Sequence, residues 1–222
     1  DGDAIQYFYE PFLAAFDPVL RDDLGIWYTP REVANYQIAR VHHHLVSDLG
    51  VSAGLADESV YILDPACGTG TYLIAAADFV YQLHCDNGEP EAVAAASTLE
   101  ALLTRFVGFE ILPAAFIISH LHLARHMEKL GANTEGTRLR VYLTNALTGW
   151  DPSDATPGLT LFPELEEELH DASVAKHHNP VLAVVGNPPY HGYSAADTEE
   201  ERRMVADWTI ATTKTWGLRK HR

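Results

Sequence analysis

The stretch Val60–Leu83, VYILDPACGTGTYLIAAADFVYQL, holds the pattern that determines the fold of this chain. It begins with a short β-rich run at 60–63, passes through a turn with two glycines, and continues as a helix-forming sequence. Strand, tight turn and helix in direct succession form the first part of a β–α–β unit. The helix in such a unit returns the chain so that the next strand runs parallel to the first. The stretch therefore predicts a parallel sheet.

Three further β-rich runs follow, and helical stretches separate them. The expected strands span 105–109, 139–143 and 181–185, and a long helix is expected over 113–131, where a proline opens it and a glycine closes it. Residues 149–179 are acidic and rich in turn residues, and they predict a partly helical excursion on the surface. Strands that alternate with helices predict an α/β fold with a mostly parallel sheet and right-handed crossovers.

A helical segment is expected before this alternation. Residues 29–32, Thr-Pro-Arg-Glu, have the spacing of a helix capping box with Pro30 at the first helical position. Apolar residues at helical spacing extend this helix to about Asp48. The chain is accordingly divided into an N-terminal helical segment, residues 1–50, and an α/β domain, residues 51–222.

Composition limits the classes of function. The chain has 222 residues and is 47% hydrophobic, which is enough for one sizeable α/β domain. Its net charge of −16 argues against a broad nucleic-acid clamp, because neutralisation of phosphates drives that kind of binding. The two cysteines, Cys67 and Cys85, predict a reducing, cytoplasmic setting. The first residues do not resemble a secretory signal, and no apolar run is long enough for a membrane span.

The candidate site residues are those that directly follow the expected strands. In open parallel sheets, ligands bind beyond the carboxyl ends of the strands, near the point where the strand order reverses. Asp64–Gly70, DPACGTG, follows the first strand, and its glycines let the backbone approach a ligand closely. Glu110 follows the second strand, Asn145 the third and Asn187–Tyr190 the fourth. The third glycine of a dinucleotide fingerprint is replaced by Leu73, which argues against a nicotinamide cofactor.

These motifs together resemble a known family. DPACGTG, the strand-end Glu110 and NPPY resemble motifs I, II and IV of S-adenosylmethionine-dependent amino-methyltransferases, and the upstream WYTP resembles their motif X. Their order resembles that of the gamma class of N6-adenine DNA methyltransferases. The N-terminal FYEPFLAAFDPVLRDDLGIWYTP and the NPPYHGY extension look most like type ISP and type IIG restriction-modification enzymes.

The resemblance implies a Rossmann-like, three-layer αβα fold and S-adenosylmethionine as the cofactor. It also implies a bacterial or archaeal protein that acts on double-stranded DNA through a recognition domain outside this chain, with nuclease or helicase parts in the same larger protein. The family's sheet has more strands than the four expected here, so the C-terminal strands are expected to be missing. A missing basic DNA-reading domain would also account for the acidic charge.

The resemblance further implies a role for each strand-end residue. Four residues of the turn after the first strand would line the methionine end of the cofactor: Asp64, Ala66, Gly68 and Gly70. Thr29 and Pro30 would close over its carboxylate. The residues after the second and third strands would hold the nucleoside: Glu110 at the ribose hydroxyls, Ile111 against the adenine ring, and Asn145 with Ala146 at the adenine edge.

The turn Asn187-Pro188-Pro189-Tyr190 is expected to be catalytic. The exocyclic amine of adenine is a poor nucleophile, because its lone pair is delocalised into the ring. The side-chain carbonyl of Asn187 and the backbone carbonyl of Pro188 can each accept one N–H of that amine and so favour attack by the lone pair. The target base must be flipped out of the duplex, and Tyr190 would stack on it. This chemistry requires no metal, and Cys67 is expected to be a packing residue.

Two alternatives remain open from the sequence. NPPY also occurs in enzymes that methylate RNA bases or protein glutamine, although the N-terminal YTP segment favours DNA. A truncated, non-catalytic cofactor-binding module is the other alternative, because strands of the family's sheet are missing. The histidines His42–His44 do not indicate a metal site, since consecutive residues of a helix point in different directions.

Overall fold

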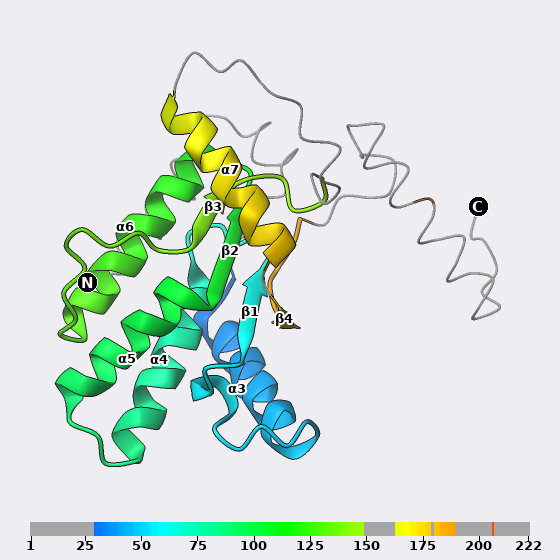
Figure 1. The fold of residues 1–222 in the computed structure, drawn as a ribbon. Coiled ribbons are helices and arrows are strands. Elements are labelled where there is room, and N and C mark those ends of the chain that lie inside the picture. The colour runs from blue at the N-terminus through cyan, green and yellow to red at the C-terminus, as the bar shows by residue number, and fades with distance from the viewer. Residues whose placement is uncertain (1–28, 149–162, 179, 190–205, 207–222) are drawn as a thin grey trace.

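The computed structural model describes residues 29–148, 163–178, 180–189 and 206. Within these residues, strands form a single sheet in the order β3-β2-β1-β4, and every neighbouring pair is parallel (Figure 1). The strands are β1 (Tyr61–Asp64), β2 (Phe106–Glu110), β3 (Val141–Leu143) and β4 (Val181–Val184). The α/β class with a parallel sheet is confirmed.

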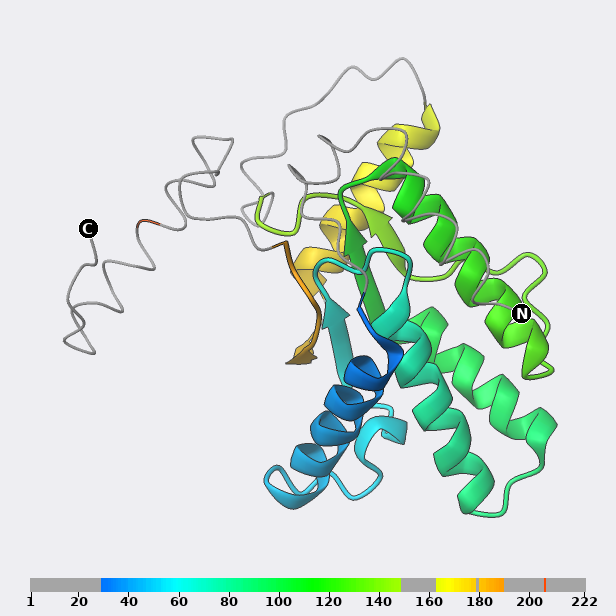
Figure 2. The same cartoon turned by 180° about the vertical axis from the view of Figure 1, so that it is seen from behind.

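Helices cover both faces of the sheet. Helices α3, α4 and α6 lie on one face, α7 lies on the other, and α5 packs beside α4 (Figures 1 and 2). The helices are α3 (Arg31–Ser47), the 3₁₀ turn η1 (Gly54–Ala56), α4 (Thr71–Asp86), α5 (Glu91–Thr104), α6 (Pro113–Lys129) and α7 (Pro163–His178). This is the three-layer arrangement expected for a Rossmann-like methyltransferase fold.

The alternation of side chains along the strands divides the core in two. On one face, Ile62 and Phe106 pack with Leu73 of α4 in the larger apolar cluster, to which α3 and α6 also contribute. On the other face, Leu63 and Val107 pack against α7. The strands β1 and β2 are thus buried on both faces, as is usual for strands inside a parallel sheet.

The expected strands are all present, but their boundaries differ from the expected ones. β1 and β2 each begin and end one residue later than expected, and β3 and β4 are shorter. Asp64 and Glu110 are the last residues of β1 and β2, and they pair in the sheet with Gly108 and Leu143. The backbones of both carboxylate residues are therefore fixed by the sheet.

The capping box expected at residues 29–32 is wrong. Helix α3 begins at Arg31, Pro30 is its N-cap residue, and no side chain makes a capping hydrogen bond there. The hydroxyl of Thr29 instead accepts a hydrogen bond from Asn187. Threonine is a residue type suited to helix capping, but Thr29 makes a tertiary contact instead.

Helix α3 shares the larger core with α4, and its residues Ala34, Ile38 and Leu45 are buried there. The boundary expected between residues 1–50 and 51–222 stays a prediction. Among the described residues, no helix is both long enough and apolar enough to cross a membrane.

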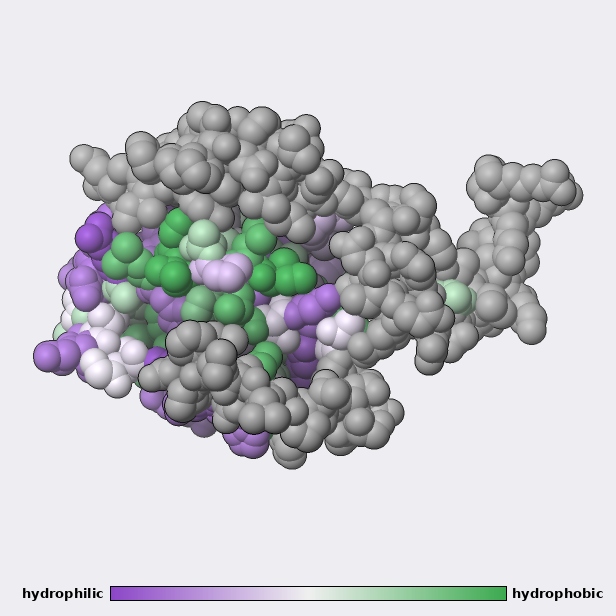
Figure 3. All heavy atoms as spheres, turned by 90° about the horizontal axis from the view of Figure 1, so that it is seen from above, coloured by the Kyte–Doolittle hydropathy of each residue, from purple (hydrophilic) through white to green (hydrophobic). Residues whose placement is uncertain are grey.

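The order of the strands determines where a ligand can bind. The chain passes from β1 outward to β2 and β3, and then returns through α7 to β4 on the other side of β1. The strand order therefore reverses between β1 and β4, and crevices of this kind bind ligands beyond the carboxyl ends of the strands. Figure 3 looks down on this end of the sheet, where apolar and polar side chains of the described residues lie side by side.

We predict that Arg105 is the polar residue on which the connection before β1 depends. Its buried guanidinium donates to the carbonyl oxygens of Leu55 (2.9 Å), Val60 (3.3 Å) and Ala56 (3.3 Å). An Arg105→Met variant removes the guanidinium that donates to these acceptors, so the free energy of unfolding should fall by about 2–4 kcal/mol.

Chemical denaturation of the Arg105→Met variant measures this loss. Arg125→Met is the control, because Arg125 is exposed on α6, and its substitution should change stability by no more than about 0.5 kcal/mol. Equal effects of the two substitutions would show that the buried guanidinium does not hold this connection.

Candidate functional site

The turn after β1 is tied to the end of β2 by backbone hydrogen bonds. The Cys67 N–H donates to the Phe109 carbonyl at 2.9 Å, and the Gly68 N–H donates to Oε2 of Glu110 at 2.8 Å. Gly68 and Gly70 have φ angles of +55° and +88°, a region that residues with a Cβ rarely adopt. The two glycines thus let the chain turn sharply from β1 into α4, which leaves backbone N–H groups at the start of that helix.

Glu110 is held by the backbone around it. The exposed fraction of this residue is 7%, and its Oε1 accepts the Leu112 N–H at 2.8 Å while its Oε2 accepts the Gly68 N–H. Burial raises the pKa of Glu110, and the backbone hydrogen bonds partly oppose that rise. A carboxylate has about four acceptor positions, so these contacts orient the group and leave capacity for hydroxyl donors.

Asp64 is the most unusual group in this region. It is completely buried, its Oδ1 accepts the Ala66 N–H at 3.2 Å, and its Oδ2 is a buried atom without a hydrogen-bond partner among the described residues. Burial raises the pKa of Asp64 to about 8, and the charge of Glu110 adds to the effect. A buried polar atom without a partner is costly, and such atoms concentrate at functional sites. The geometry fits a ligand that brings a hydrogen-bond donor to Asp64.

Gly186 brings the end of β4 directly against Asp64. A Cβ atom at position 186 would lie 2.6 Å from Oδ1 of Asp64 and 3.2 Å from Cδ of Pro65. Any other residue would force the two segments apart. This role was not predicted from the sequence, although a glycine directly before the Asn-Pro-Pro turn was the available signal.

Asn187 follows Gly186 and is fixed by a residue from the other end of the chain. Its Nδ2 donates to Oγ1 of Thr29 at 3.1 Å. Asn187 and Thr29 are half-buried, whereas Pro188 and Pro189 are exposed. The structure thus brings the expected motif X threonine to the expected catalytic amide. Tyr190, the fourth residue of the expected catalytic turn, lies outside the described residues.

The loop after β3 is organised by a buried lysine that the sequence analysis missed. Lys176 of α7 is 8% exposed, and its Nζ donates to Oγ1 of Thr144 (2.9 Å) and to the carbonyl oxygens of Asn145 (2.7 Å) and Thr148 (2.6 Å). The ammonium also lies 5.6 Å from the centre of the Phe109 ring. A lysine in an acidic helical stretch gives no local signal of burial, because such residues usually face water.

The remaining cofactor candidates lie at the same end of the sheet. The Asn145 side chain accepts the Leu147 N–H at 2.9 Å, a turn contact that shapes the loop after β3. Ala146 is half-buried against the smaller core cluster. Ile111 is 55% exposed directly after β2, so an apolar side chain is accessible beside Glu110. The structure places the strand-end candidates on neighbouring strands, and the cofactor roles assigned to them stay predictions.

Cys67 lies in the core rather than on an accessible surface. It is 5% exposed, and a Cβ atom at Gly108 would approach its Sγ to 3.0 Å. Burial and the nearby carboxylates of Asp64 and Glu110 raise the pKa of its thiol, which disfavours the nucleophilic thiolate. Among the described residues, no group of three or more His, Cys, Asp or Glu side chains is arranged to hold a metal ion.

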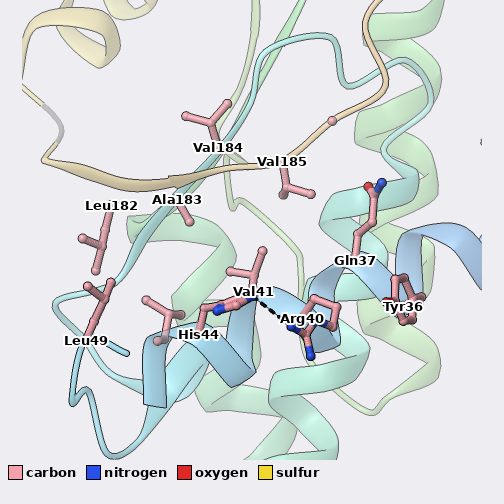
Figure 4. A pocket seen from close by; sticks show the side chains of 12 residues that line it. Tyr36, Gln37, Arg40, Val41, His44, Leu49, Leu182, Ala183, Val184 and Val185 are labelled. Atoms are coloured by element: carbon pink, nitrogen blue, oxygen red, sulfur yellow. Dashed lines mark hydrogen bonds between the residues drawn. The ribbon is translucent and has the colours of Figure 1, made fainter. Parts of the chain in front are cut away.

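A groove between α3 and β4 lies next to this region (Figure 4). Tyr36 and Arg40 of α3 and Leu182 and Val184 of β4 line it, and it extends to Gly186. The described residues that line it include no carboxylate, in contrast to the ends of β1 and β2. The candidate site is therefore the group of strand ends around Asp64, Glu110 and Asn187.

We predict that Asp64 makes stability depend on pH. Its pKa is about 8 in the folded protein against an ordinary value of 3.8, so unfolding releases a proton between these values. Stability should therefore fall as pH rises from 4 to 8. An Asp64→Asn variant should lack this component, and its stability relative to the wild type should increase over the same interval.

Thermal unfolding at a series of pH values measures this difference. Asp57 is a control of opposite sign, because hydrogen bonds from Ser59 lower its pKa. An Asp57→Asn variant should lose relative stability at neutral pH and recover it below pH 3.8. A constant stability difference between Asp64→Asn and wild type across pH 4–8 would contradict the burial of an unpaired carboxyl.

Solved structures share this fold. A type ISP restriction-modification enzyme, LlaBIII, bound to DNA has a TM-score of 0.66 and 23% identity over 86% of this chain. The DrdV–DNA complex has a TM-score of 0.70 and 24% identity over 92% of this chain. A nuclease-deletion mutant of the type ISP enzyme LlaGI in complex with a DNA substrate mimic has a TM-score of 0.67 and 22% identity over 92%. This chain covers 12%, 18% and 16% of those chains, respectively.

Sequence comparisons give the family. No curated protein sequence matches the chain. A family model described as N-6 DNA Methylase matches residues 1–216, which is nearly the whole chain. The chain belongs to the N-6 DNA Methylase family.

Proposed function

We propose that this chain is the catalytic part of a DNA methyltransferase that transfers a methyl group from S-adenosylmethionine to N6 of adenine, within a restriction-modification or phage-defence system. The observation that carries the proposal is the position of Asn187. It lies at the reversal of the strand order, directly beyond the contact between Gly186 and the buried Asp64. Family membership supports the reaction class.

The residues present fit S-adenosylmethionine. The unpartnered Oδ2 of Asp64 is suited to the ammonium group of its methionine part, since a buried carboxyl gains most from a cationic donor. The turn through Ala66, Gly68 and Gly70 exposes backbone to that part, and the start of α4 is favourable for its carboxylate. When bound, the cofactor supplies a methyl group on a positively charged sulfur. Pro30 would contribute to the closure over the methionine carboxylate.

The nucleoside of the cofactor would lie along the ends of β2 and β3. Glu110 has oriented oxygens that can accept the ribose hydroxyls. The exposed side chain of Ile111 offers an apolar surface to the adenine ring. Asn145 and Ala146 lie on the loop that Lys176 fixes, so the adenine edge would face a backbone whose conformation is already held.

The target amine would be activated by two oxygen acceptors. Oδ1 of Asn187 and the carbonyl oxygen of Pro188 would accept its two N–H groups, which favours a more pyramidal nitrogen with an available lone pair. Consecutive prolines restrict the turn, so little reorganisation is needed when the amine arrives. Tyr190 would provide a stacking surface for the flipped base, worth about 1–3 kcal/mol.

DNA would have to be held largely by other parts of the protein. A net charge of −16 gives this chain little general attraction for phosphates. LlaBIII and DrdV are seen with DNA, and this chain corresponds to a minor part of each. A recognition domain, and nuclease or helicase parts, are therefore proposed for the whole protein, with this chain as its methyl-transfer site.

The proposal predicts that Asn187→Ala reduces methyl transfer to DNA by at least about 100-fold, the scale of losing a positioned acceptor in an active site. The affinity for S-adenosylmethionine should stay close to that of the wild type, because the predicted cofactor contacts lie elsewhere. The whole protein is incubated with tritiated cofactor and DNA, and digested DNA is analysed for N6-methyladenine. Calorimetry measures cofactor binding.

Asn133→Ala is the matched control, because Asn133 is exposed and its side chain accepts a local turn hydrogen bond from the Glu135 N–H, so full activity is expected. Parallel reactions with RNA and with protein substrates test the alternatives. Methyl transfer to either one in place of DNA would overturn the proposed substrate. Full activity of Asn187→Ala would overturn the proposed catalytic role.

A further inference from the structure

We infer that Thr29 is a positioning residue for Asn187, and that its hydroxyl holds the amide so that Oδ1 is presented to the target amine. The inference rests on the proposed function. It assigns Thr29 a role in the methyl-transfer step, whereas the resemblance assigned it to closure over the cofactor. The contact that carries it is the 3.1 Å hydrogen bond from Nδ2 of Asn187 to Oγ1 of Thr29.

Thr29 is itself held in a defined place. It directly precedes Pro30, which restricts its backbone to extended conformations. Helix α3 begins two residues later and is anchored to α4 by an ion pair between Arg31 and Asp78, with 2.6 Å between Nη2 and Oδ2. The hydroxyl of Tyr72 at the start of α4 donates to Gln37 of α3 at 2.5 Å. These contacts hold the start of α3, next to Thr29, against α4, the helix that follows the turn after β1.

The threonine hydroxyl has no helix-capping role that would account for it. A threonine before a helix usually caps it, and here no side chain caps α3. The hydroxyl contacts a residue 158 positions away in the sequence instead. We therefore expect that the function of the hydroxyl at this position is its hydrogen bond with Asn187.

The chemistry of an amide explains why such a contact matters. An asparagine side chain presents an acceptor oxygen on one branch and two N–H donors on the other, and the two branches have nearly the same shape. The adenine amine is a donor, so only the oxygen branch can receive it productively. With Nδ2 bonded to Thr29, rotation of the amide is restricted and Oδ1 occupies the other branch. Loss of the contact would leave more orientations to be sampled before transfer.

The two roles of Thr29 predict different kinetics. If it positions Asn187, Thr29→Val should lower kcat about tenfold, as expected for one lost hydrogen bond, and leave the dissociation constant of S-adenosylmethionine unchanged. If it closes over the cofactor, the dissociation constant should rise and kcat at saturating cofactor should be preserved. Thr29→Ser retains the hydroxyl and should restore most of kcat. Thr104→Val, at the far end of α5, is the matched control and should behave as wild type.

The variants are compared in the whole protein at saturating cofactor and DNA, where the steady-state rate gives kcat, and cofactor binding is measured by calorimetry. Unchanged kcat in Thr29→Val, a purely weaker cofactor affinity, or failure of Thr29→Ser to restore the rate would each overturn the inference. If Thr29→Val lowers the melting temperature, Thr29→Ala provides the same comparison without added bulk.

A second readout keeps this inference separate from the proposed function. In protein labelled with ¹⁵N-asparagine, the side-chain amide signal of Asn187, identified by its loss in Asn187→Ala, should shift in Thr29→Val but not in Thr104→Val. An unshifted signal would contradict the hydrogen bond itself. A wild-type protein that methylates no DNA would refute the proposed function and leave this structural result standing.

Discussion

The close contact between the end of β4 and the buried carboxyl of Asp64 is the constraint on which the candidate site depends. A parallel sheet whose strand order reverses at β1 must bring a distant segment beside the turn after β1. Gly186 allows the closest approach, because a Cβ there would reach within 2.6 Å of Oδ1 of Asp64. Asp64 is completely buried at this contact, and the approach also brings Asn187 to the same place. Cofactor binding and catalysis would therefore share one packing contact.

The polar groups around this contact form a connected arrangement. Glu110 ties the turn after β1 to the end of β2, Lys176 ties the loop after β3 to α7, and Thr29 ties the start of α3 to Asn187. Each of these contacts joins segments far apart in the sequence, so each depends on the tertiary fold. Asp64 differs from the others, because its Oδ2 has no partner among the described residues. A buried oxygen without a hydrogen bond, among polar neighbours that have hydrogen-bond partners, points to a ligand that binds there.

The strands, the direction of the sheet and the strand-end candidates could be predicted from the sequence, because hydrophobic runs and glycine turns are local signals. The predicted boundaries of β1 and β2 lie one residue before the observed ones. In the sequence, an acidic residue at a strand end resembles a turn residue, and only its pairing in the sheet shows that it belongs to the strand. The role of Lys176 could not be predicted, because its three oxygen partners come from a different segment. The partner of Thr29 could not be predicted either, because the same threonine satisfies the pattern of a helix cap.

We propose that the ends of β1, β2 and β3 form one cofactor-binding site beside the turn after β4. Hydrogen exchange of the whole protein, measured by mass spectrometry with and without S-adenosylmethionine, tests it most directly. We expect slower exchange in residues 64–70, 110–112 and 144–148 when the cofactor is present. Protection confined to residues 36–49 of the neighbouring groove, or no protection at the strand ends, would contradict it.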